Sequence, residues 1–379
     1  MRTALDRSLF PVTERWAYLN HAGVGPLAAP VVEAIHAAAR VVAENGSVGV
    51  EDRLEAMEGV RAKAARLLGV PAADVAFVKN TTEGIGFVAS GLDFGPGDRV
   101  VVPDLEFPST LLPWVALEPL GVRVDRVAPE GPGRAVLVER VAEALDRGPC
   151  RVVACSWVQF GRGWRADLAA LAEVCHAHGA LLCVDVIQGL GVLPARLAEW
   201  GVDFAAADAH KWLLGPEGIG VLYVAERCLD LLRPLEPGWA SVAHRTEWEN
   251  LDLVWAPDAR RFEGGSFNMT GIAALGTTAD LLLDAGVDRV WHHVDGLLER
   301  AAAGLADLGA TVLSDRSGEG RSGILTFEVP GADHAAAARL LEAEGVVLSA
   351  RGGGLRVSPH GYNTEAEIDT LLAAVASLR

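Results

Sequence analysis

The stretch Ala206–Val224, "AADAHKWLLGPEGIGVLYV", places a histidine and a lysine directly after an apolar, alanine-rich run. A Gly-Pro turn follows, and then a second apolar run that predicts another strand. Lysine usually lies on a solvated face. A lysine at the end of a buried strand therefore predicts a special environment for its amine.

On the N-terminal side of this stretch, short apolar segments that predict strands alternate with segments that predict helices. Seven strands are expected, in the segments 74–80, 97–104, 122–128, 150–157, 180–185, 202–208 and 218–224. Continuous apolar strands joined by helices are typical of a mostly parallel sheet covered on both faces. The sequence therefore predicts an α/β fold for this part of the chain.

The two ends of the chain differ from this alternating middle. Two helices are expected first, one from Pro26 to about Glu44 and one from Glu51 that closes at Gly69. After about Gly271 two long helical runs lead into short strands and helices, which indicates a smaller α+β domain. The Trp-rich segment 235–265 has an irregular pattern and predicts an active-site loop or part of an interface.

Composition limits the class of protein. The chain has 379 residues, enough for two domains, and its net charge of −17 argues against a nucleic-acid partner. No apolar run reaches the length of a membrane span, and the N-terminus lacks the apolar core of a signal peptide. The five cysteines are odd in number and form no CxxC pair, which favours a cytoplasmic protein with reduced, buried thiols.

Polar or aromatic side chains follow several of the strands, and ligands of parallel sheets bind outside the carboxyl ends of the strands. Thr81 and Thr82 open a helix, whose N-terminus can bind an anion through free N–H groups. Phe107 and Asp185 follow two other strands, and a buried carboxylate needs a cation or a donor. Taken one at a time, these residues also fit a helix cap, a core aromatic ring and a turn-capping carboxylate.

Together these residues predict a site for pyridoxal phosphate (PLP). Desolvation and nearby charge can lower the pKa of a lysine, which suits Lys211 for a Schiff base. Asp185 would hold the proton of the ring nitrogen, and Gln188 would donate toward the phenolic oxygen. Phe107 would stack on the ring face.

The chain resembles the class V aminotransferase family of fold-type I PLP enzymes, which includes cysteine desulfurases and isopenicillin N epimerase-like proteins. The resemblance covers nearly the whole chain and rests on the ordered motifs "YLNHAGVGPL", "NTTEGIGFVASGL", "EFPS", "VDVIQGLG", "DFAAADAHKWLLGPEGIGVLYV", "RFEGGSFN" and "LRVSPHGYNTEAEID". It implies a large domain over residues 15–265 with a mostly parallel seven-stranded sheet. A small α+β domain would combine residues 1–14 and 266–379.

The resemblance also implies roles for individual residues. The implied catalytic residues are Lys211, Asp185 and His210. The implied cofactor-binding set is Thr81, Thr82, Phe107, Asp185, Gln188, His210, Lys211 and Ser266, and the substrate-binding set is Arg356, Trp157 and Asn20. Because the family is dimeric with active sites at the interface, Ser266 would reach the phosphate of the other subunit's cofactor. Arg356 matches the family's arginine for the substrate carboxylate, a pairing that guanidinium geometry favours.

Three departures from the family pattern bear on activity. Asp208 stands where relatives often carry a hydroxyl residue, and it would repel a phosphate, so it is expected to point elsewhere, toward a backbone donor or an arginine. Phe107 replaces the ring-stacking histidine of cysteine desulfurases, so proton transfers fall mainly to Lys211. No cysteine lies beyond Cys228, and the loop before Arg356 is "SARGGGL", so a persulfide-forming desulfurase is not expected.

The implied function is a PLP-dependent enzyme acting at Cα of an amino acid through an external aldimine and a quinonoid. The freed Lys211 would remove the Cα proton. The family favours transamination by a class V aminotransferase, and the sulfur-handling relatives keep a β-eliminating C–S lyase as the alternative, ahead of isopenicillin N epimerase-like racemisation. A catalytically silent PLP-fold protein would be expected to lose Lys211 or Asp185, and both are present.

Other kinds of site have weaker support. No Gly-rich strand-to-helix turn near the N-terminus suits a nicotinamide cofactor. The histidines at 176–178 and 292–293 lie on predicted helices, far from a matching carboxylate set, so no metal site is expected. Trp157, Trp212 and Trp239 are the tryptophans expected near the cofactor. The expected partners are an amino-acid substrate and a second copy of the chain, with no nucleic acid and no membrane.

Overall fold

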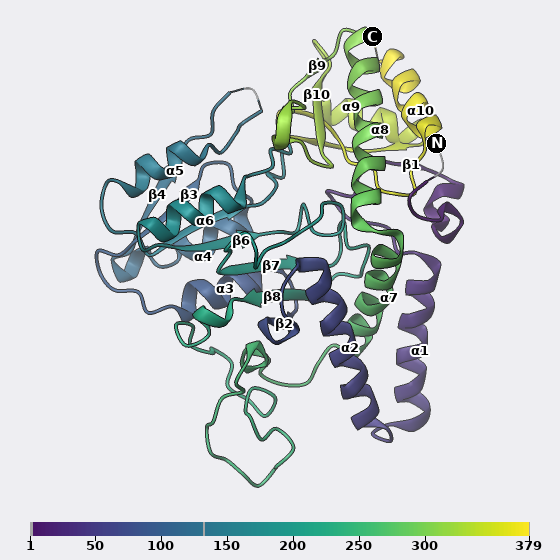
Figure 1. Cartoon of the computed structure of the whole chain (residues 1–379). Coiled ribbons are helices and arrows are strands. Elements are labelled where there is room, and N and C mark those ends of the chain that lie inside the picture. Colours follow the sequence, from purple (N-terminus) through teal and green to yellow (C-terminus); the bar gives the residue numbers. More distant parts are fainter. Residues whose placement is uncertain (1–2, 132, 379) are drawn as a thin grey trace.

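A computed structural model describes residues 3–131 and 133–378 of the chain (Figure 1). Its centre is a seven-stranded sheet with the strand order β2-β8-β7-β6-β5-β3-β4. The strands are β2 (Val75–Val78), β3 (Arg99–Pro103), β4 (Arg123–Val127), β5 (Val152–Ser156), β6 (Leu181–Asp185), β7 (Phe204–Asp208) and β8 (Gly220–Val224). The predicted α/β fold with a seven-stranded sheet is confirmed.

The strand directions explain where Lys211 lies. β4, β3, β5, β6 and β7 are parallel neighbours, whereas β8 runs antiparallel to both β7 and β2. A parallel connection needs a long crossover, usually a helix. The segment 209–219 between β7 and β8 contains no helix, so the chain turns back antiparallel. Lys211 lies in this turn, at the carboxyl end of β7.

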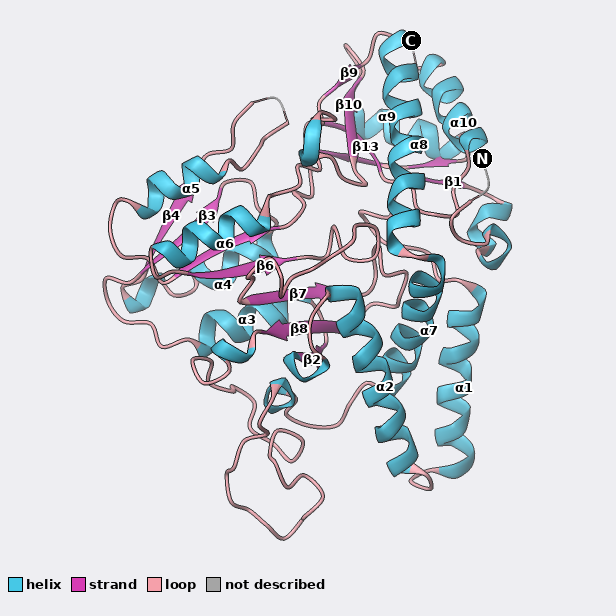
Figure 2. Cartoon of the chain, in the orientation of Figure 1, coloured by secondary structure: helices cyan, strands magenta, loops and turns pink. Residues whose placement is uncertain are grey.

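Four helices connect the parallel strands and pack on the sheet (Figure 2). They are α3 (Thr81–Gly91), α4 (Pro108–Val115), α5 (Val138–Leu145) and α6 (Leu168–Ala177). Every residue of β3, β5, β7 and β8 is buried, which explains their continuous apolar sequences. A Cβ on Gly84 of α3 would lie 2.6 Å from the Cβ of Ala206, so glycine allows α3 to pack closely on β7.

Beside the sheet, three helices pack together: α1 (Ala29–Asn45), α2 (Val50–Leu68) and α7 (Met269–Ala285). The predicted start of α1 at Pro26 is wrong. A helix from Pro26 would place Pro30 in its second turn, where the missing N–H and the ring would disrupt the helix. With the start at Ala29, Pro30 lies in the first turn and is tolerated. α2 is closed by Gly69, as predicted, and this cap residue has a φ of 69°.

The segment after β3 forms an α-helix followed by a short 3-10 helix. α4 ends at Val115, and a short 3-10 helix follows at Glu118–Leu120. The other 3-10 helices are Arg7–Leu9, Pro11–Glu14, Ala72–Asp74, Glu226–Cys228, Ala259–Phe262 and Gly318–Gly320.

The C-terminal part forms a separate layer of strands and helices at the top of Figure 1. Its four-stranded sheet has the order β12-β13-β10-β9. The elements are α8 (Val287–Asp307), β9 (Thr311–Val312), β10 (Leu325–Glu328), α9 (His334–Ala343), β11 (Val346–Val347), β12 (Ser349–Arg351), β13 (Gly354–Val357) and α10 (Glu365–Ala376).

The N-terminal segment packs on this C-terminal part. β1 (Ala17–Tyr18) pairs in parallel with β11, and the Ala4 N–H donates to the Gly361 carbonyl at 2.8 Å. The predicted domain limits remain a prediction, and this pairing favours moving the N-terminal limit past residue 18. Residues 1, 2 and 379 of the predicted small domain lie outside the described residues.

The Trp-rich segment 235–265 is largely irregular and forms the long loop at the bottom of Figure 1. Trp248 and Leu251 on this loop are 70% and 91% exposed. Its far end is anchored, because Glu263 accepts hydrogen bonds from Arg61 at 2.6 Å and from the Phe77 N–H at 2.7 Å. The loop therefore presents large apolar side chains outward from a fixed base.

Candidate active site

A pocket of about 460 Å³ lies at the carboxyl edge of the sheet, between the strand ends, the N-terminal segment and the β12–β13 hairpin. Nine predicted site residues line it: Asn20, Thr81, Thr82, Phe107, Asp185, Gln188, His210, Lys211 and Arg356. The fold thus brings together residues from both ends of the chain. Trp157 and Ser266 are not among the lining residues.

Lys211 is buried, with 8% of its surface exposed. Burial lowers the pKa of Lys211 to about 8, against the opposing charge of Asp185. A substantial fraction of the amine is therefore neutral near physiological pH, as a nucleophile and base requires.

The other lysines of the chain do not share this environment. The chain has three lysines, Lys63, Lys79 and Lys211. Lys63 pairs with Asp280 and Lys79 with Glu83, and both ammonium-bearing side chains are at least a third exposed. Of the three lysines, which all lie within the described residues, Lys211 alone is buried with a lowered pKa.

The N-terminal loop holds the backbone at Lys211 in place. The Gly25 N–H donates to the His210 carbonyl at 2.7 Å. A Cβ on Gly25 would lie 2.3 Å from the Lys211 carbonyl oxygen, which no side chain could tolerate. Glycine at this position is what allows the loop to close on the lysine.

Asp185 ends β6 and is buried at the pocket wall. Its Oδ2 accepts from the Thr110 hydroxyl at 2.9 Å and its Oδ1 from the Ile187 N–H at 3.0 Å. Burial raises the pKa of the Asp185 carboxyl, while the nearby charge of Lys211 lowers it. Each oxygen keeps room for another donor, such as a protonated ring nitrogen.

Phe107 lies at the start of α4, and Lys211 Nζ is 5.4 Å from the centroid of its ring. Phe160 packs edge-on against Phe107, with the ring centroids 5.4 Å apart, and also lines the pocket. These contacts form an aromatic platform facing the lysine.

A buried carboxyl group, Glu106, holds the turn before this platform. It accepts hydrogen bonds from both the N–H and the hydroxyl of Ser156. Burial raises the pKa of Glu106 to about 7, partly offset by Ser156. Glu106 belongs to the motif "EFPS", but nothing in the sequence shows that Ser156 of the neighbouring strand faces it.

The N-terminus of α3 forms the other end of the pocket. Asn80 caps the helix by accepting from the Glu83 N–H, and the N–H groups of a first helical turn have no acceptor within the helix. Thr81 Oγ accepts from the Asp208 N–H at 3.0 Å, and the Thr82 hydroxyl lies 2.8 Å from that of Ser109. Such a helix start suits an anion such as a phosphate.

Asp208 points to neither of the partners expected from the sequence. Its Oδ2 lies 3.0 Å from Nδ1 of His210, at ion-pair distance, although the angle is not that of a hydrogen bond. The expected contact with a backbone donor or an arginine is therefore replaced by an imidazole. The contact depends on the local turn after β7, which strand patterning does not resolve.

Arg356 is a buried arginine with no carboxylate partner among the described residues. It is 3% exposed, its Nη1 donates to the Phe160 carbonyl at 2.5 Å, and its Nε has no hydrogen-bond partner. Burial, together with the nearby charge of Arg351, lowers the pKa of Arg356 to about 10. A buried cation of this kind is completed by an anionic ligand.

Arg351 also lines the pocket and was missed by sequence reasoning. Ser349 pairs with Arg356 across the β12–β13 hairpin, and Ser349 and Arg351 lie two residues apart on β12. Alternate residues of a strand share a face, so all three side chains face the pocket. The alternation of Ser349 and Arg351 before the glycine run was the available signal.

The residues Gln188 and Trp212 form a buried pair. Trp212 Nε1 donates to Gln188 Oε1 at 2.9 Å, and Gln188 Nε2 donates to the Ala22 carbonyl at 3.0 Å. Because the tryptophan fixes which side of the amide carries nitrogen, one amide hydrogen of Gln188 remains for a ligand.

The family model of the class-V aminotransferases matches residues 17–371. The chain belongs to the class-V aminotransferase family. A probable cysteine desulfurase of Methanothermobacter thermautotrophicus is 31% identical, over 98% of this chain and 96% of its own length. An uncharacterized aminotransferase of Bacillus subtilis, YcbU, is 28% identical over 98% of this chain and 96% of its own length.

Solved structures agree with this assignment. The cystine C–S lyase C-DES, in complex with its reaction product cysteine persulfide, is 26% identical, with a TM-score of 0.88 over 97% of this chain and 99% of that chain. A C-DES variant with glycine covalently linked to the PLP cofactor has a TM-score of 0.90, with 26% identity over 98% of this chain and 99% of that chain. This class-V chain is therefore a PLP-dependent enzyme, as predicted.

The residues of the class-V pocket fit PLP. Lys211, Asp185 and Phe107 offer an amine, a carboxylate and a ring platform, and the start of α3 offers an anion site. Arg356 Nε, Asn20 Oδ1 and Ser349 Oγ lack partners within the described protein. These incomplete groups indicate that the pocket is built for polar ligands.

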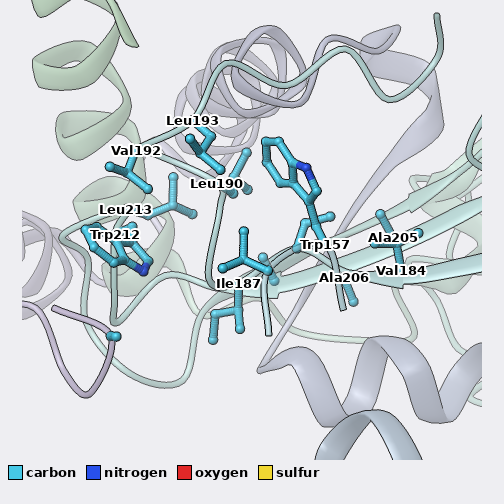
Figure 3. Close-up of a cluster of buried hydrophobic side chains, with 14 of the residues drawn as sticks. Trp157, Val184, Ile187, Leu190, Val192, Leu193, Ala205, Ala206, Trp212 and Leu213 are labelled. Atoms are coloured by element: carbon cyan, nitrogen blue, oxygen red, sulfur yellow. The ribbon is translucent and has the colours of Figure 1, made fainter. Parts of the chain in front are cut away.

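Trp157 does not lie in this class-V pocket. Its ring packs on Trp200 with centroids 5.4 Å apart and lines a separate cavity of about 630 Å³. Figure 3 shows Trp157 and Trp212 in one buried apolar cluster, with Ile187 between them in this view. Trp212 donates a hydrogen bond to Gln188, which lines the active-site pocket. Trp157 does not line that pocket and is not placed to contact a substrate there.

Ser266 and Trp239 also lie outside the pocket. Ser266 lines a smaller cavity of about 220 Å³ with Lys79 and Glu83. Trp239 packs on Trp248 and on Phe267. The predicted contact of Ser266 with the partner subunit's cofactor stays a prediction.

The cysteines of this class-V chain are all free and buried, as predicted: Cys150, Cys155, Cys175, Cys183 and Cys228. Burial raises the pKa of Cys175 and of Cys228 to about 12, so these thiols resist forming thiolates. Among the described residues, no helix is long and apolar enough to cross a membrane.

Proposed function

We propose that this class-V enzyme is an aminotransferase acting on an amino acid. The observation that carries the proposal is Lys211, a buried amine with a pKa lowered to about 8, facing Phe107 across the pocket. Transamination needs one base that takes the Cα proton and returns a proton nearby. Lys211 is suited to both transfers, because Phe107 cannot act as acid or base.

PLP, when bound, supplies an electron sink for the electron pair left at Cα. Asp185 would keep a proton on the ring nitrogen, because its two oxygens are oriented by Thr110 and Ile187. Gln188, fixed by Trp212, would donate one amide hydrogen toward the phenolic oxygen.

Arg356 would bind the substrate carboxylate. Its guanidinium is buried and its Nε lacks a partner, so a carboxylate would satisfy both the charge and the donor. The Phe160 carbonyl accepts from Nη1 and helps to orient the guanidinium. Asn20, whose Oδ1 is also without a partner, is placed to accept from the substrate.

A β-eliminating C–S lyase is the second candidate. Two observations favour it: the similarity to C-DES, a cystine C–S lyase, and the five buried thiols of this chain. A lyase whose sulfur leaves within the product needs no cysteine of its own. Racemisation is less well supported, because the platform residue Phe107 cannot return a proton to Cα.

We also infer a homodimer with active sites at the interface, in the cytoplasm. The exposed apolar residues of the Trp-rich loop, Trp248, Leu251, Leu253 and Val254, support an interface there. Ser266 lies between the end of that loop and the start of α7, so its hydroxyl could contact the active site of a second copy of the chain.

The test is a titration of the purified holoenzyme with L- and D-amino acids, including S-substituted cysteines, with products assayed in the same cuvette. Transamination predicts stoichiometric loss of the cofactor's visible absorption, one oxo acid per site and recovery on adding an oxo acid. Continuous release of ammonia and oxo acid, with the cofactor's visible absorption retained, would show that the enzyme is a lyase and not an aminotransferase. Inversion of Cα alone would contradict both.

A further inference from the structure

The phosphate end of the pocket contains a carboxylate, which is unexpected for an anion site. Asp208 lines the pocket together with Thr81 and Thr82 of the α3 N-terminus. It is only 7% exposed, so solvent screens its charge poorly. A bare carboxylate there would oppose the binding of a phosphate.

His210 changes this electrostatic balance. Its Nδ1 lies 3.0 Å from Oδ2 of Asp208, and its ring lines the same pocket. Nδ1 of His210 is buried and makes no hydrogen bond with a described residue, so its contact with Asp208 is an ion-pair contact alone. An imidazole with a proton on each nitrogen could face Asp208 with one and a phosphate with the other.

The backbone fixes this arrangement. The Asp208 N–H donates to Thr81 Oγ at 3.0 Å, which ties the end of β7 to the start of α3. The His210 carbonyl accepts from the Gly25 N–H at 2.7 Å, which holds the residue from the other side. The backbone at both residues is thus held by contacts that do not depend on a ligand.

We propose that Asp208 is a positioning residue for phosphate binding, holding the His210 imidazole so that it donates to the phosphate of PLP. The carboxylate of Asp208 then favours phosphate binding, because it orients the imidazole of His210, which donates a hydrogen bond to the phosphate. The proposal rests on the cofactor's phosphate lying at the start of α3.

The test compares PLP with pyridoxal, which lacks the phosphate. The full-length holoenzyme is dialysed to equilibrium against graded PLP or pyridoxal, and bound cofactor is read from its visible absorption. Asp208→Asn is expected to weaken PLP binding about tenfold and pyridoxal binding less than twofold. A carboxylate that merely repels phosphate predicts the opposite, tighter PLP binding in Asp208→Asn, and that result would overturn the proposal.

His210→Gln and the double variant complete the cycle. If the two residues act as a unit, His210→Gln weakens PLP binding about as much as Asp208→Asn, and the double variant is no worse than either. Independent, multiplying losses would contradict the pair, as would equal losses for PLP and pyridoxal, which indicate a structural role only. Unchanged PLP binding in Asp208→Asn would also contradict it.

Thr82→Ala locates the phosphate separately. This substitution is expected to weaken the binding of PLP but not of pyridoxal, because Thr82 lies in the first turn of α3 and lines the pocket. If Thr82→Ala and Asp208→Asn both leave PLP selectivity unchanged, the phosphate is not at α3. If only Thr82→Ala reduces the selectivity for PLP over pyridoxal, the phosphate does lie at the start of α3, but the proposed role of Asp208 is wrong.

Discussion

Lys211 Nζ lies 5.4 Å from the centroid of the Phe107 ring, so the reactive amine faces an aromatic platform and not a second acid or base. This relationship joins the turn after β7 to the start of α4. In the proposed function, Lys211 would then carry the proton transfers and Phe107 would serve as a binding residue.

Phe107→Leu should therefore weaken PLP binding without removing Schiff-base formation. Aromatic stacking contributes about 0.5–1.5 kcal/mol, which corresponds to roughly 2- to 10-fold in the Kd. The Kd is measured by equilibrium dialysis of the full chain. Leu112→Ala, an exposed position on the same helix, is the control and should leave the Kd unchanged. Loss of all bound cofactor would contradict a stacking role.

The pKa of Lys211 predicts how cofactor uptake depends on pH. Burial lowers that pKa to about 8, so the amine is mostly protonated below pH 8 and mostly neutral above it. The rate of Schiff-base formation by cofactor-stripped enzyme should rise with pH and level off above about pH 8. Asp185→Asn should move the midpoint lower, because the Asp185 charge raises the pKa of Lys211. A wild-type midpoint near that of an ordinary lysine, about 10.4, would show that burial has no such effect.

Asp185→Ala should retain bound PLP but reduce kcat by at least about a hundredfold, the scale of losing one electrostatic contact in an active site. The reason is that the ring nitrogen loses the carboxylate that holds its proton. Thr110→Val, which removes only one hydrogen-bond donor to Asp185, should reduce kcat far less. Absorption and kcat are measured on the same samples, and an unchanged kcat in Asp185→Ala would refute the role.

Arg356→Ala should raise KM for amino acids by about 10- to 100-fold with cofactor absorption intact, since a hydrogen bond to a charged group contributes about 1.5–3 kcal/mol. Arg356→Lys should recover only part of the loss, because lysine keeps the charge but not the planar fork. Arg339→Ala, on the exposed face of α9, is the neutral control. Loss of PLP from Arg356→Ala would mean that the arginine serves the cofactor.

Much of the fold and of the site could be predicted because strand ends are visible in sequence. Lys211, Asp185 and Phe107 each follow a strand, and a parallel sheet brings its carboxyl ends to one edge. Trp157 follows a strand as well, yet lines another cavity. A shift of one residue reverses the face of a strand, and apolar patterning cannot resolve it where both faces are buried.

The contacts that sequence could not supply are those set by turns and hairpin register. Arg351 faces the pocket because the β12–β13 register places Ser349 opposite Arg356. The approach of Asp208 to His210 depends on the turn after β7. The start of α1 at Ala29, by contrast, could have been derived from Pro30 alone.

The most direct test of the central claim is to reduce the holoenzyme with borohydride and map the modified peptide by mass. The chain has three lysines, so the assignment is unambiguous. We predict one pyridoxyl phosphate group per chain, attached to Lys211, and no stable modification in Lys211→Ala. Attachment to Lys63 or Lys79, or no attachment after incubation with PLP, would contradict the assignment of this pocket.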